Sequence, residues 1–397
     1  MTTTPVNVAV ITTSRADFGH IVWPVKVMQE HPGFTVEVIA IGAHLSPSFG
    51  NTVDAMEQHG ITANHKLETL LSSDSDTGMA KTIGVSILSL SDLLSRIRPD
   101  ILLVTADRYE MLAAAATALA LRIPIAHVEG GEISAGAIDD AVRNALTKLS
   151  HIHFAPHEQA AARIRAMGEE TWRVCVSGAP SLDHLKHRTL LDREQLTSLL
   201  NVKIDSAFNL ISFHPVTLMD DTVAEAEAFY SSLESIQGQM LFCFPNCDAG
   251  SHQLIDRANR YCERHEDSHV FVNLDHWTYW SLLHQAKVML GNSSSALMEA
   301  PSAPLPAVNI GERQRGRLMA DNVIDCPASS DAIVEAWQKA VSDDFTDSIA
   351  DMTNPYGDGQ AATRMCEFLL KHNDRARLLD KKARTLTCHD DIDGFSK

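Results

Sequence analysis

The chain has 397 residues, of which 45% are hydrophobic and 21% charged, and its formal net charge is −18. This length exceeds what one hydrophobic core usually holds, so we expect two domains, and the charge argues against nucleic acid or an anionic membrane as the main partner. No apolar run approaches the roughly 20 residues that span a bilayer. Residues 1–5 do not start like a signal peptide, and the seven cysteines are irregularly spaced, so we expect a cytoplasmic protein.

Short apolar stretches alternate with helical patterns through the first half of the chain. Residues 83–97 and 109–121 have helical patterns; in the first, Ile83, Ile87 and Leu90 share one face. The alternation predicts a mostly parallel sheet with helices on both faces. The predicted strands are 6–12, 34–41, 61–65, 100–105, 123–128, 152–155 and 172–176.

A second series of strands follows the polar stretch 183–206. We therefore expect an α/β protein with two Rossmann-like domains that face each other across a cleft. The expected parts are an N-terminal domain (1–182), a connection (183–206), a second domain (207–373) and a charged tail (374–397) that is peripheral or partly disordered. The predicted strands of the second domain are 209–213, 239–244, 268–272, 287–290 and 305–309.

Acidic side chains follow two successive predicted strands. The strand at 100–105 leads into Asp107, and the strand at 123–128 runs directly into Glu129, with Asp139 ten residues later. Ligands of open α/β sheets bind at the carboxyl ends of the strands, so these carboxylates should share one edge. Several acids at that edge indicate an enzyme that transfers protons.

Arg15 lies in the turn after the first strand, where a phosphate group is often bound. Its guanidinium group suits an anion, although an exposed Arg15 paired with Asp17 is the simpler alternative. The glycine pattern GxGxxG is absent, which argues against a nicotinamide cofactor.

Three further segments follow predicted strands of the second domain. Gly291–Ser295 offers three serines before a helix, which indicates ligand contact as well as helix capping. Three arginines between glycines, in Gly311–Arg317, suggest recognition of an anion. His214 also ends a strand and could be structural or functional.

Motifs for metal binding are absent from the sequence. We find neither HExxH nor an EF-hand pattern, and Cys243 and Cys247 have no second pair at zinc spacing, so we interpret them as core thiols. His151 and His153 alternate along a predicted strand, where packing is the simpler interpretation.

Together these segments resemble the UDP-N-acetylglucosamine 2-epimerase family, over residues 6 to 370. Glu129-Gly130-Gly131-Glu132, followed by Gly136–Asp140, is similar to the hydrolysing branch, which opens sialic-acid-type pathways. The chain departs from the family pattern at Ala106, usually Gly, at Asn144, often His, and at His20, where related members carry Lys. The other matching segments are Ser14–Phe18, Asp107–Glu110, Arg143, Lys148, His214-Pro215, Gly291–Ser295, Gly311–Gln314 and Asn354–Gly359.

The resemblance implies a GT-B-like architecture and a defined reaction. UDP leaves C1 of the sugar, a carboxylate removes the C2 proton, and water adds to the resulting 2-acetamidoglycal to give N-acetylmannosamine. The implied catalytic residues are Asp107, Glu129 and Asp139, with Arg143 in support; which is base and which acid stays open. No metal or redox cofactor is implied, and we expect a homodimer or homotetramer. The implied substrate-binding residues are Arg15, Arg108, His214, Ser293, Ser294, Glu299 and Arg313.

Three alternatives remain at this point. The same reaction on UDP-2,4-diacetamido-2,4,6-trideoxyglucose would serve a legionaminic acid pathway. A glycosyltransferase of the same architecture would need an acceptor pocket and would not need three acids at these strand ends. A non-catalytic sensor of sugar nucleotides would be favoured if the acids were missing, and all three are present.

Overall fold

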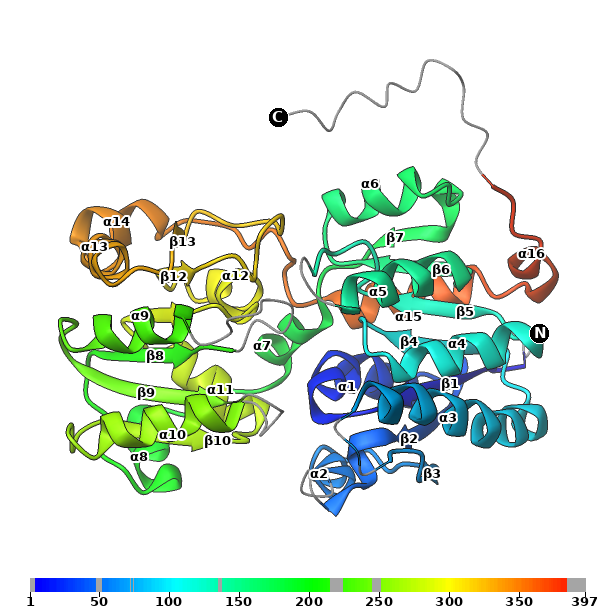
Figure 1. Cartoon of the computed structure of the whole chain (residues 1–397). Helices are drawn as coiled ribbons and strands as arrows, with labels where there is room; N and C mark the ends of the chain where they lie inside the picture. The colour runs from blue at the N-terminus through cyan, green and yellow to red at the C-terminus, as the bar shows by residue number, and fades with distance from the viewer. Residues whose placement is uncertain are drawn as a thin grey trace.

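The computed structural model describes residues 4–47, 52–71, 73, 75–134, 138–214, 224–244 and 251–383. Two parallel sheets, each covered by helices, lie side by side, with α7 (His184–His187) between them (Figure 1). The predicted fold, two Rossmann-like units of the GT-B kind, is confirmed. We call them the first unit and the second unit.

The first unit is built on a seven-stranded sheet with the order β3-β2-β1-β4-β5-β6-β7. β4 is buried along its whole length, as the apolar sequence of a central parallel strand requires. The order reverses between β1 and β4, which pair from Val8 with Ile101 to Val10 with Leu103. The strands are β1 (Val6–Thr12), β2 (Phe34–Ile41), β3 (His65–Leu67), β4 (Ile101–Thr105), β5 (Ile125–Val128), β6 (Ile152–Ala155) and β7 (Val174–Val176).

Helices cover both faces of this sheet. α1 (Arg15–Glu30) packs on one face, and α3 (Asp76–Ile97), α4 (Glu110–Ala120) and α5 (Ile138–Leu149) pack on the other. α3 begins seven residues before the predicted helix because Ser75 caps it, accepting a hydrogen bond from the Gly78 amide. The unit also contains α2 (Val53–Gln58), α6 (Glu158–Ala166) and the short helices Gly42–Leu45, Thr171–Arg173 and Pro180–Asp183.

The second unit has a six-stranded sheet with the order β10-β9-β8-β11-β12-β13, which reverses between β8 and β11. Its strands are β8 (Phe208–Ser212), β9 (Gln239–Phe244), β10 (His269–Val272), β11 (Val288–Gly291), β12 (Ala307–Ile310) and β13 (Val323–Cys326). One face carries α9 (Ala224–Leu233), α10 (Ser251–Cys262) and α13 (Ser330–Ala340), and the other α8 (Arg193–Leu200), α11 (His276–Leu283) and α12 (Ser295–Met298). α14 (Asp343–Ile349) and the turn Ala300–Ser302 complete it.

Three sequence predictions are corrected here. The third strand lies at His65–Leu67 and not at 61–65, and β13 was missed. The connection 183–206 is largely helical, because it contains α7 and α8, and Leu196 of α8 is buried against the second unit.

The end of the chain returns to the first unit. α15 (Ala361–Lys371) packs on α1, so the second unit does not extend to residue 373 as predicted (Figure 1). α16 (Arg375–Leu379) buries Leu378, and the Arg173 guanidinium donates to the Leu378 and Asp380 carbonyls. Residues 374–383 therefore lie against the first unit, with Leu378 buried and most of the others exposed, which agrees with the predicted peripheral position of the tail, and 384–397 lie outside the described residues.

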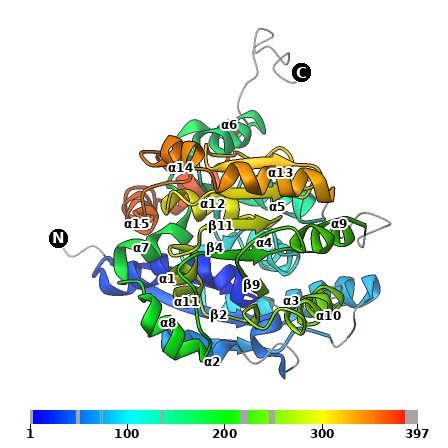
Figure 2. The ribbon, with the colours of Figure 1, turned by 90° about the vertical axis from the view of Figure 1, so that its left-hand side faces the viewer.

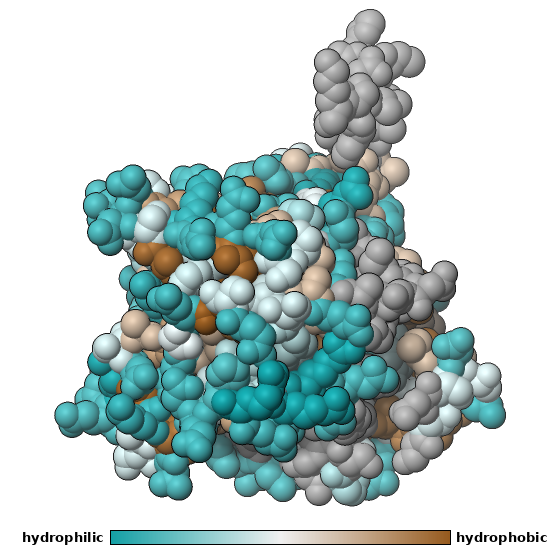
Figure 3. Space-filling model, turned by 60° about the vertical axis from the view of Figure 1, so that its left-hand side comes forward, coloured by the Kyte–Doolittle hydropathy of each residue, from teal (hydrophilic) through white to brown (hydrophobic). Residues whose placement is uncertain are grey.

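Neither the face drawn in Figure 3 nor any described helix presents an apolar region of the size that spans a membrane. The face drawn in Figure 3 is mainly hydrophilic, with apolar side chains in small separate groups. Within the described part of the chain, none of the helices combines the length and the apolar character needed to cross a membrane.

Candidate active site in the cleft

The first turns of α1 contact His276 at the start of α11, and these two helices lie one behind the other in the view of Figure 2. A Cβ at Gly19 would lie 2.4 Å from the ring of His276, so only glycine permits this approach. His276 Nε2 lies 3.4 Å from the Arg15 carbonyl, and the Arg15 guanidinium donates to the Asn273 carbonyl. The first strand's turn is thereby fixed against the second unit.

Asp17 has a structural role in that turn. Its buried carboxylate accepts hydrogen bonds from the hydroxyls of Thr12, Thr13 and Ser14 and from two backbone amides. The simpler alternative, an exposed Arg15 paired with Asp17, is therefore not what the structure contains. Arg15 faces the cleft instead, where burial lowers its pKa and Asp275 partly offsets the change.

A cavity of about 170 Å³ lies in the cleft between the units. Four predicted binding residues line it: Arg15, His214, Ser293 and Glu299. Ser294 is outside this lining and precedes α12. The polar lining residues outside the predicted binding set are His20, Ser181, Ser212, His276, Tyr279 and Ser295.

The ends of β8 and β11 are joined by Asn292. Its side chain accepts from the His214 amide at 2.7 Å and donates to the His214 carbonyl at 2.8 Å. The Asn292 carbonyl accepts from Arg313 at 2.9 Å and Gln314 at 2.7 Å. Burial and the Arg313 charge lower the pKa of His214 to about 3, so its imidazole is neutral at pH 7.

The three predicted acids lie at the first unit's strand ends. Asp107 follows β4, Glu129 follows β5, and Asp139 is in the first turn of α5. Arg143 joins the first two, because one guanidinium nitrogen donates to the Asp107 carboxylate and another to the Glu129 carbonyl at 2.7 Å. Ser134 also donates to Asp107, at 3.0 Å. Asp107 and Glu129 therefore follow neighbouring parallel strands at one edge of the sheet, as the sequence predicts, and Asp139 follows in the next helix.

Two of these carboxyl groups have pKa values displaced in opposite directions. Burial raises the pKa of Asp107, but the guanidinium groups of Arg143 and Arg317 outweigh burial and hold it below the usual value. Burial and the negative charge of Asp107 raise the pKa of Asp139. Arg108, predicted as a binding residue, opposes that rise and also donates to Glu110 at 3.4 Å.

The backbone beside the acids is strained. Ala106 has φ = 56° and Glu129 has φ = 60°, the left-handed region that side chains other than glycine rarely adopt. A glycine at position 106 would adopt this conformation without strain. His127 Nε2 donates to the Ala106 carbonyl at 2.8 Å and supports the turn. Burial lowers the pKa of His127 to about 3, which keeps this imidazole neutral.

His20 connects the acids to the cavity. Its Nδ1 lies 2.8 Å from Glu129 Oε1, and the same ring lines the cavity. Burial lowers the pKa of His20, but the Glu129 carboxylate outweighs burial and the result is about 9. A signal for His20 existed in the sequence, because related members carry Lys at this position.

The comparisons with known proteins agree with this geometry. The model of a family described as UDP-N-acetylglucosamine 2-epimerase matches residues 26–370. The chain belongs to the UDP-N-acetylglucosamine 2-epimerase family. The predicted resemblance to this family and its hydrolysing branch is confirmed.

Individual relatives of this epimerase family bear different names. The chain is 32% identical, over 85% of its length and 88% of the relative's, to GDP/UDP-N,N'-diacetylbacillosamine 2-epimerase (hydrolyzing) of Campylobacter jejuni. It is also 32% identical to a UDP-N-acetylglucosamine 2-epimerase of Neisseria meningitidis serogroup B, over 84% of its length and 86% of the relative's. A Neisseria meningitidis UDP-GlcNAc 2-epimerase, solved bound to UDP-GlcNAc, has the same fold, with a TM-score of 0.80 and 20% identity over 92% of this chain and 100% of that one.

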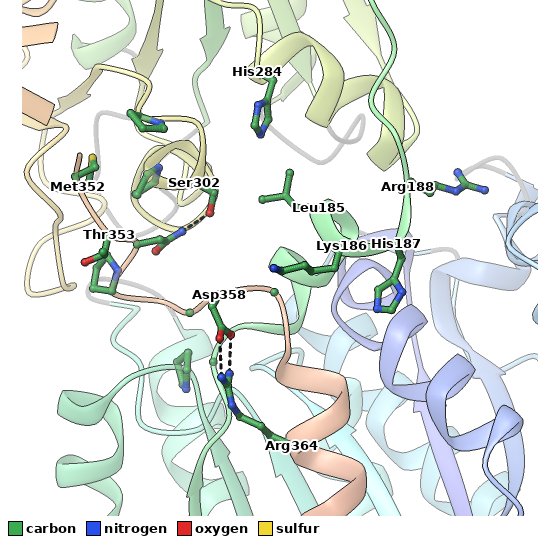
Figure 4. Close-up of a pocket in the computed structure, with 18 of the residues that line it drawn as sticks. Leu185, Lys186, His187, Arg188, His284, Ser302, Met352, Thr353, Asp358 and Arg364 are labelled. Carbon is green, nitrogen blue, oxygen red and sulfur yellow. Dashed lines mark hydrogen bonds and ion pairs between the residues drawn. The ribbon is translucent and has the colours of Figure 1, made fainter. Parts of the chain in front are cut away.

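A larger hollow, of about 1480 Å³, lies where the chain crosses between the units (Figure 4). The chain crosses between the units twice, at residues 183–192 (the first crossing) and 350–360 (the second crossing), and residues of both crossings, among them Lys186 and Asp358, line this hollow. The Asp358 carboxylate accepts two hydrogen bonds from Arg364, of 2.7 and 2.8 Å. None of the predicted catalytic or substrate-binding residues lines this hollow, whereas four of the predicted binding residues line the smaller cavity, next to which His20 contacts Glu129. The size of the hollow therefore does not make it the active site of this epimerase-family protein.

Among the residues that the structure describes, no group of three His, Cys, Asp or Glu side chains is arranged to hold a metal ion. Cys243 is buried in β9, and burial raises its pKa to about 12, as expected for a core thiol. Cys247 lies outside the described residues.

Proposed function

We propose that the protein is a hydrolysing epimerase that converts a UDP-2-acetamido sugar to UDP and the free sugar inverted at C2. The observation that carries this proposal is the pair Asp107 and Asp139, whose pKa values are displaced in opposite directions at one strand edge. A reaction that removes a proton from C2 and returns one needs a base and an acid at the same time.

In the proposed first step, UDP leaves C1 as the C2 proton is removed. The C1–O bond breaks with its electron pair going to UDP, and Asp107, which is held ionised, takes the proton. The C2–H electron pair becomes the C1–C2 double bond of the 2-acetamidoglycal. We assign to Arg15, which lines the cavity, and to Arg313, which donates to the Asn292 carbonyl, the stabilisation of the charge that develops on the diphosphate.

In the second step, water adds across this double bond. Its oxygen bonds to C1, Asp139 gives its proton to C2 from the opposite face, and the proton that the water loses passes to the solvent. Asp107 then releases its proton and Asp139 takes one up, so that both return to their starting states. We assign to Glu129, held by His20, the stabilisation of positive charge at C1 during both steps. No nicotinamide or metal is needed for this balance of atoms and electrons.

The sugar is the least defined part of the proposal. Relatives at 32% identity are named for N,N'-diacetylbacillosamine and for N-acetylglucosamine, so both UDP-sugars are candidates. Purified protein is incubated with each, and products are separated by anion exchange. Equal amounts of UDP and free 2-epimeric sugar from one of them support the proposal. A C2-inverted sugar still joined to UDP, or turnover only with an added acceptor, would contradict it.

A further inference from the structure

A buried carboxylate outside the proposed catalytic set joins the two units. Glu132 follows Glu129 in the loop after β5, and its side chain is only 2% exposed. His157 Nε2 lies 2.6 Å from Glu132 Oε1, while His157 Nδ1 accepts from the Ala160 amide, so the proton on Nε2 is donated to Glu132. The carboxylate therefore has a fixed orientation within the first unit.

Each unit supplies a guanidinium group that faces Glu132: Arg163 Nη1 of the first unit lies 3.8 Å from Glu132 Oε1, and the second unit supplies Arg317. Arg317 Nε lies 3.8 Å from Glu132 Oε2 and donates to the Ile133 carbonyl at 2.6 Å. Tyr356, in the second crossing, lies 3.5 Å from Glu132 and donates to the Leu318 carbonyl at 2.9 Å. The loop between β12 and β13 is thus attached to the loop that carries Glu129.

A second contact holds the same two loops together. Arg163 of α6 donates to the Gly131 carbonyl at 2.9 Å and to the Gly316 carbonyl at 3.4 Å. A Cβ at Gly316 would lie 3.3 Å from Ile133, which measures how closely the loops pack. The loop fixed in this way also contains Arg313, whose guanidinium group reaches the cleft residue Asn292.

From this position Arg317 affects the pKa values of two carboxyl groups, those of Glu132 and Asp107. Its charge helps to lower the pKa of Glu132, and it is also, after Arg143, the guanidinium group that most lowers the pKa of Asp107. The Ile133 carbonyl that accepts from Arg317 is next in the chain to Ser134, whose hydroxyl donates to Asp107 at 3.0 Å, so the Arg317 guanidinium group lies close to this carboxylate. Besides Arg143, the other groups that face Asp107 are Arg108, Ser134, Asp139, Arg313 and His127.

We infer that Arg317, held by Glu132, is a positioning residue that fixes a positive charge beside the catalytic carboxylate Asp107 and sets the Arg313 loop against the first unit. The inference rests on the proposed function, in which Asp107 is the base. It assigns a purpose to Glu132, the second acid of the Glu-Gly-Gly-Glu segment, which the proposed reaction does not use.

The decisive measurement is kcat/KM against pH for Arg317→Gln, Arg317→Lys and the matched control Arg315→Gln. Arg315 lies in the same loop, 78% exposed, in a surface pair with Glu312. In Arg317→Gln the acid limb of kcat/KM moves to higher pH by about one unit, because Asp107 keeps Arg143 but loses the second guanidinium group. Arg317→Lys restores the limb, and Arg315→Gln leaves it unchanged. An unmoved limb in Arg317→Gln would overturn the inference.

The part assigned to Glu132 is tested by a double-variant cycle. Glu132→Gln keeps the hydrogen-bonding shape and lowers kcat/KM at its plateau. Because Glu132 acts through Arg317, adding Glu132→Gln to Arg317→Gln should cause no further loss. Losses that multiply in the double variant would show that the two residues act separately.

A readout independent of turnover separates this inference from the proposed function. A carboxyl whose pKa is lowered by folding stabilises the protein above its unfolded value, and this stability is lost as the pH falls through the folded value. Arg317→Gln should therefore lower the Tm at pH 7 much more than at pH 3, with no such pattern in Arg315→Gln. This pattern without turnover would remove the proposed function only; turnover without it would remove the inference.

Discussion

His20 Nδ1 lies 2.8 Å from Oε1 of Glu129, so an ion pair joins α1 to the loop after β5 at the edge of the cleft. Both side chains are mostly buried, at 25% and 6% exposure. A lysine in place of His20 would be charged at every physiological pH. In this chain the charge can be titrated.

The first prediction concerns the pH dependence of turnover. Because the pKa of His20 is raised to about 9, its positive charge is lost above that pH, and kcat/KM should decline as the pH rises through about 9. His20→Lys should keep its activity to higher pH, and His20→Gln should be slow without a limb near 9. The control is His65→Gln, which removes a similar pair with Glu37 at 2.7 Å, far from the cleft. An unchanged basic limb in His20→Lys would remove His20 from this role.

The residues of the site that follow strands could be predicted from the sequence, whereas those that act through distant contacts could not. The acids and serines lie directly after apolar runs, and the ends of parallel strands must meet at one edge, so their clustering follows from local sequence. His20 acts through its contact with Glu129, and Glu132 through its contact with Arg317. In both pairs the partners lie over a hundred residues apart in the sequence. No local pattern encodes such partners, and only the family comparison drew attention to position 20.

Some elements of the fold could likewise be predicted from the sequence and others could not. Strand positions were predicted well where the apolar run was long, as in β1 and β4. β3 has three residues, none of them fully buried, and so little pattern to detect. The return of α15 to the first unit could not be predicted, because its apolar stripe, with Met365 and Leu369 buried, would fit either sheet.

The second prediction concerns the strained turn before Asp107. Ala106→Gly should relieve the left-handed conformation and raise the free energy of unfolding by about 0.5–1 kcal/mol, measured in urea. The control is Ala116→Gly on the exposed side of α4, where the same exchange should lower it by about 1 kcal/mol. A loss of stability in both variants would mean that the turn at Ala106 is not strained.

The third prediction concerns the three acids. Asp107→Asn, Glu129→Gln and Asp139→Asn should each reduce kcat by about 10²–10⁴-fold, the range for a general acid or base, while circular dichroism shows an intact fold. Asp92→Asn, on the exposed side of α3, is the control and should turn over normally. Near wild-type kcat in any of the three would remove that residue from the catalytic set.

The fourth prediction concerns the nucleotide. Arg313 is buried beside Asn292, and burial together with Arg317 lowers its pKa to about 10, so it stays charged at pH 7. Arg313→Ala should weaken UDP binding in calorimetry by about tenfold or more. The control is Arg315→Ala, a change of an exposed residue in the same loop, and this variant should bind UDP as the wild type does. Equal affinities in the two variants would reject a role for Arg313 in anion recognition.

The last prediction follows the atoms of water. In heavy-oxygen water the label should appear at C1 of the free sugar, because the bond from C1 to the UDP oxygen is the one that breaks. In deuterated water deuterium should appear at C2, because the proton taken by Asp107 is not the one that returns from the opposite face. Mass spectrometry and proton NMR of the purified sugar locate both labels. Oxygen label at C1 with the original hydrogen and configuration at C2 would mean simple glycosidic hydrolysis. A UDP-sugar that carries deuterium at an inverted C2 and no oxygen label would instead mean that UDP returns to C1, and the hydrolytic step would be wrong.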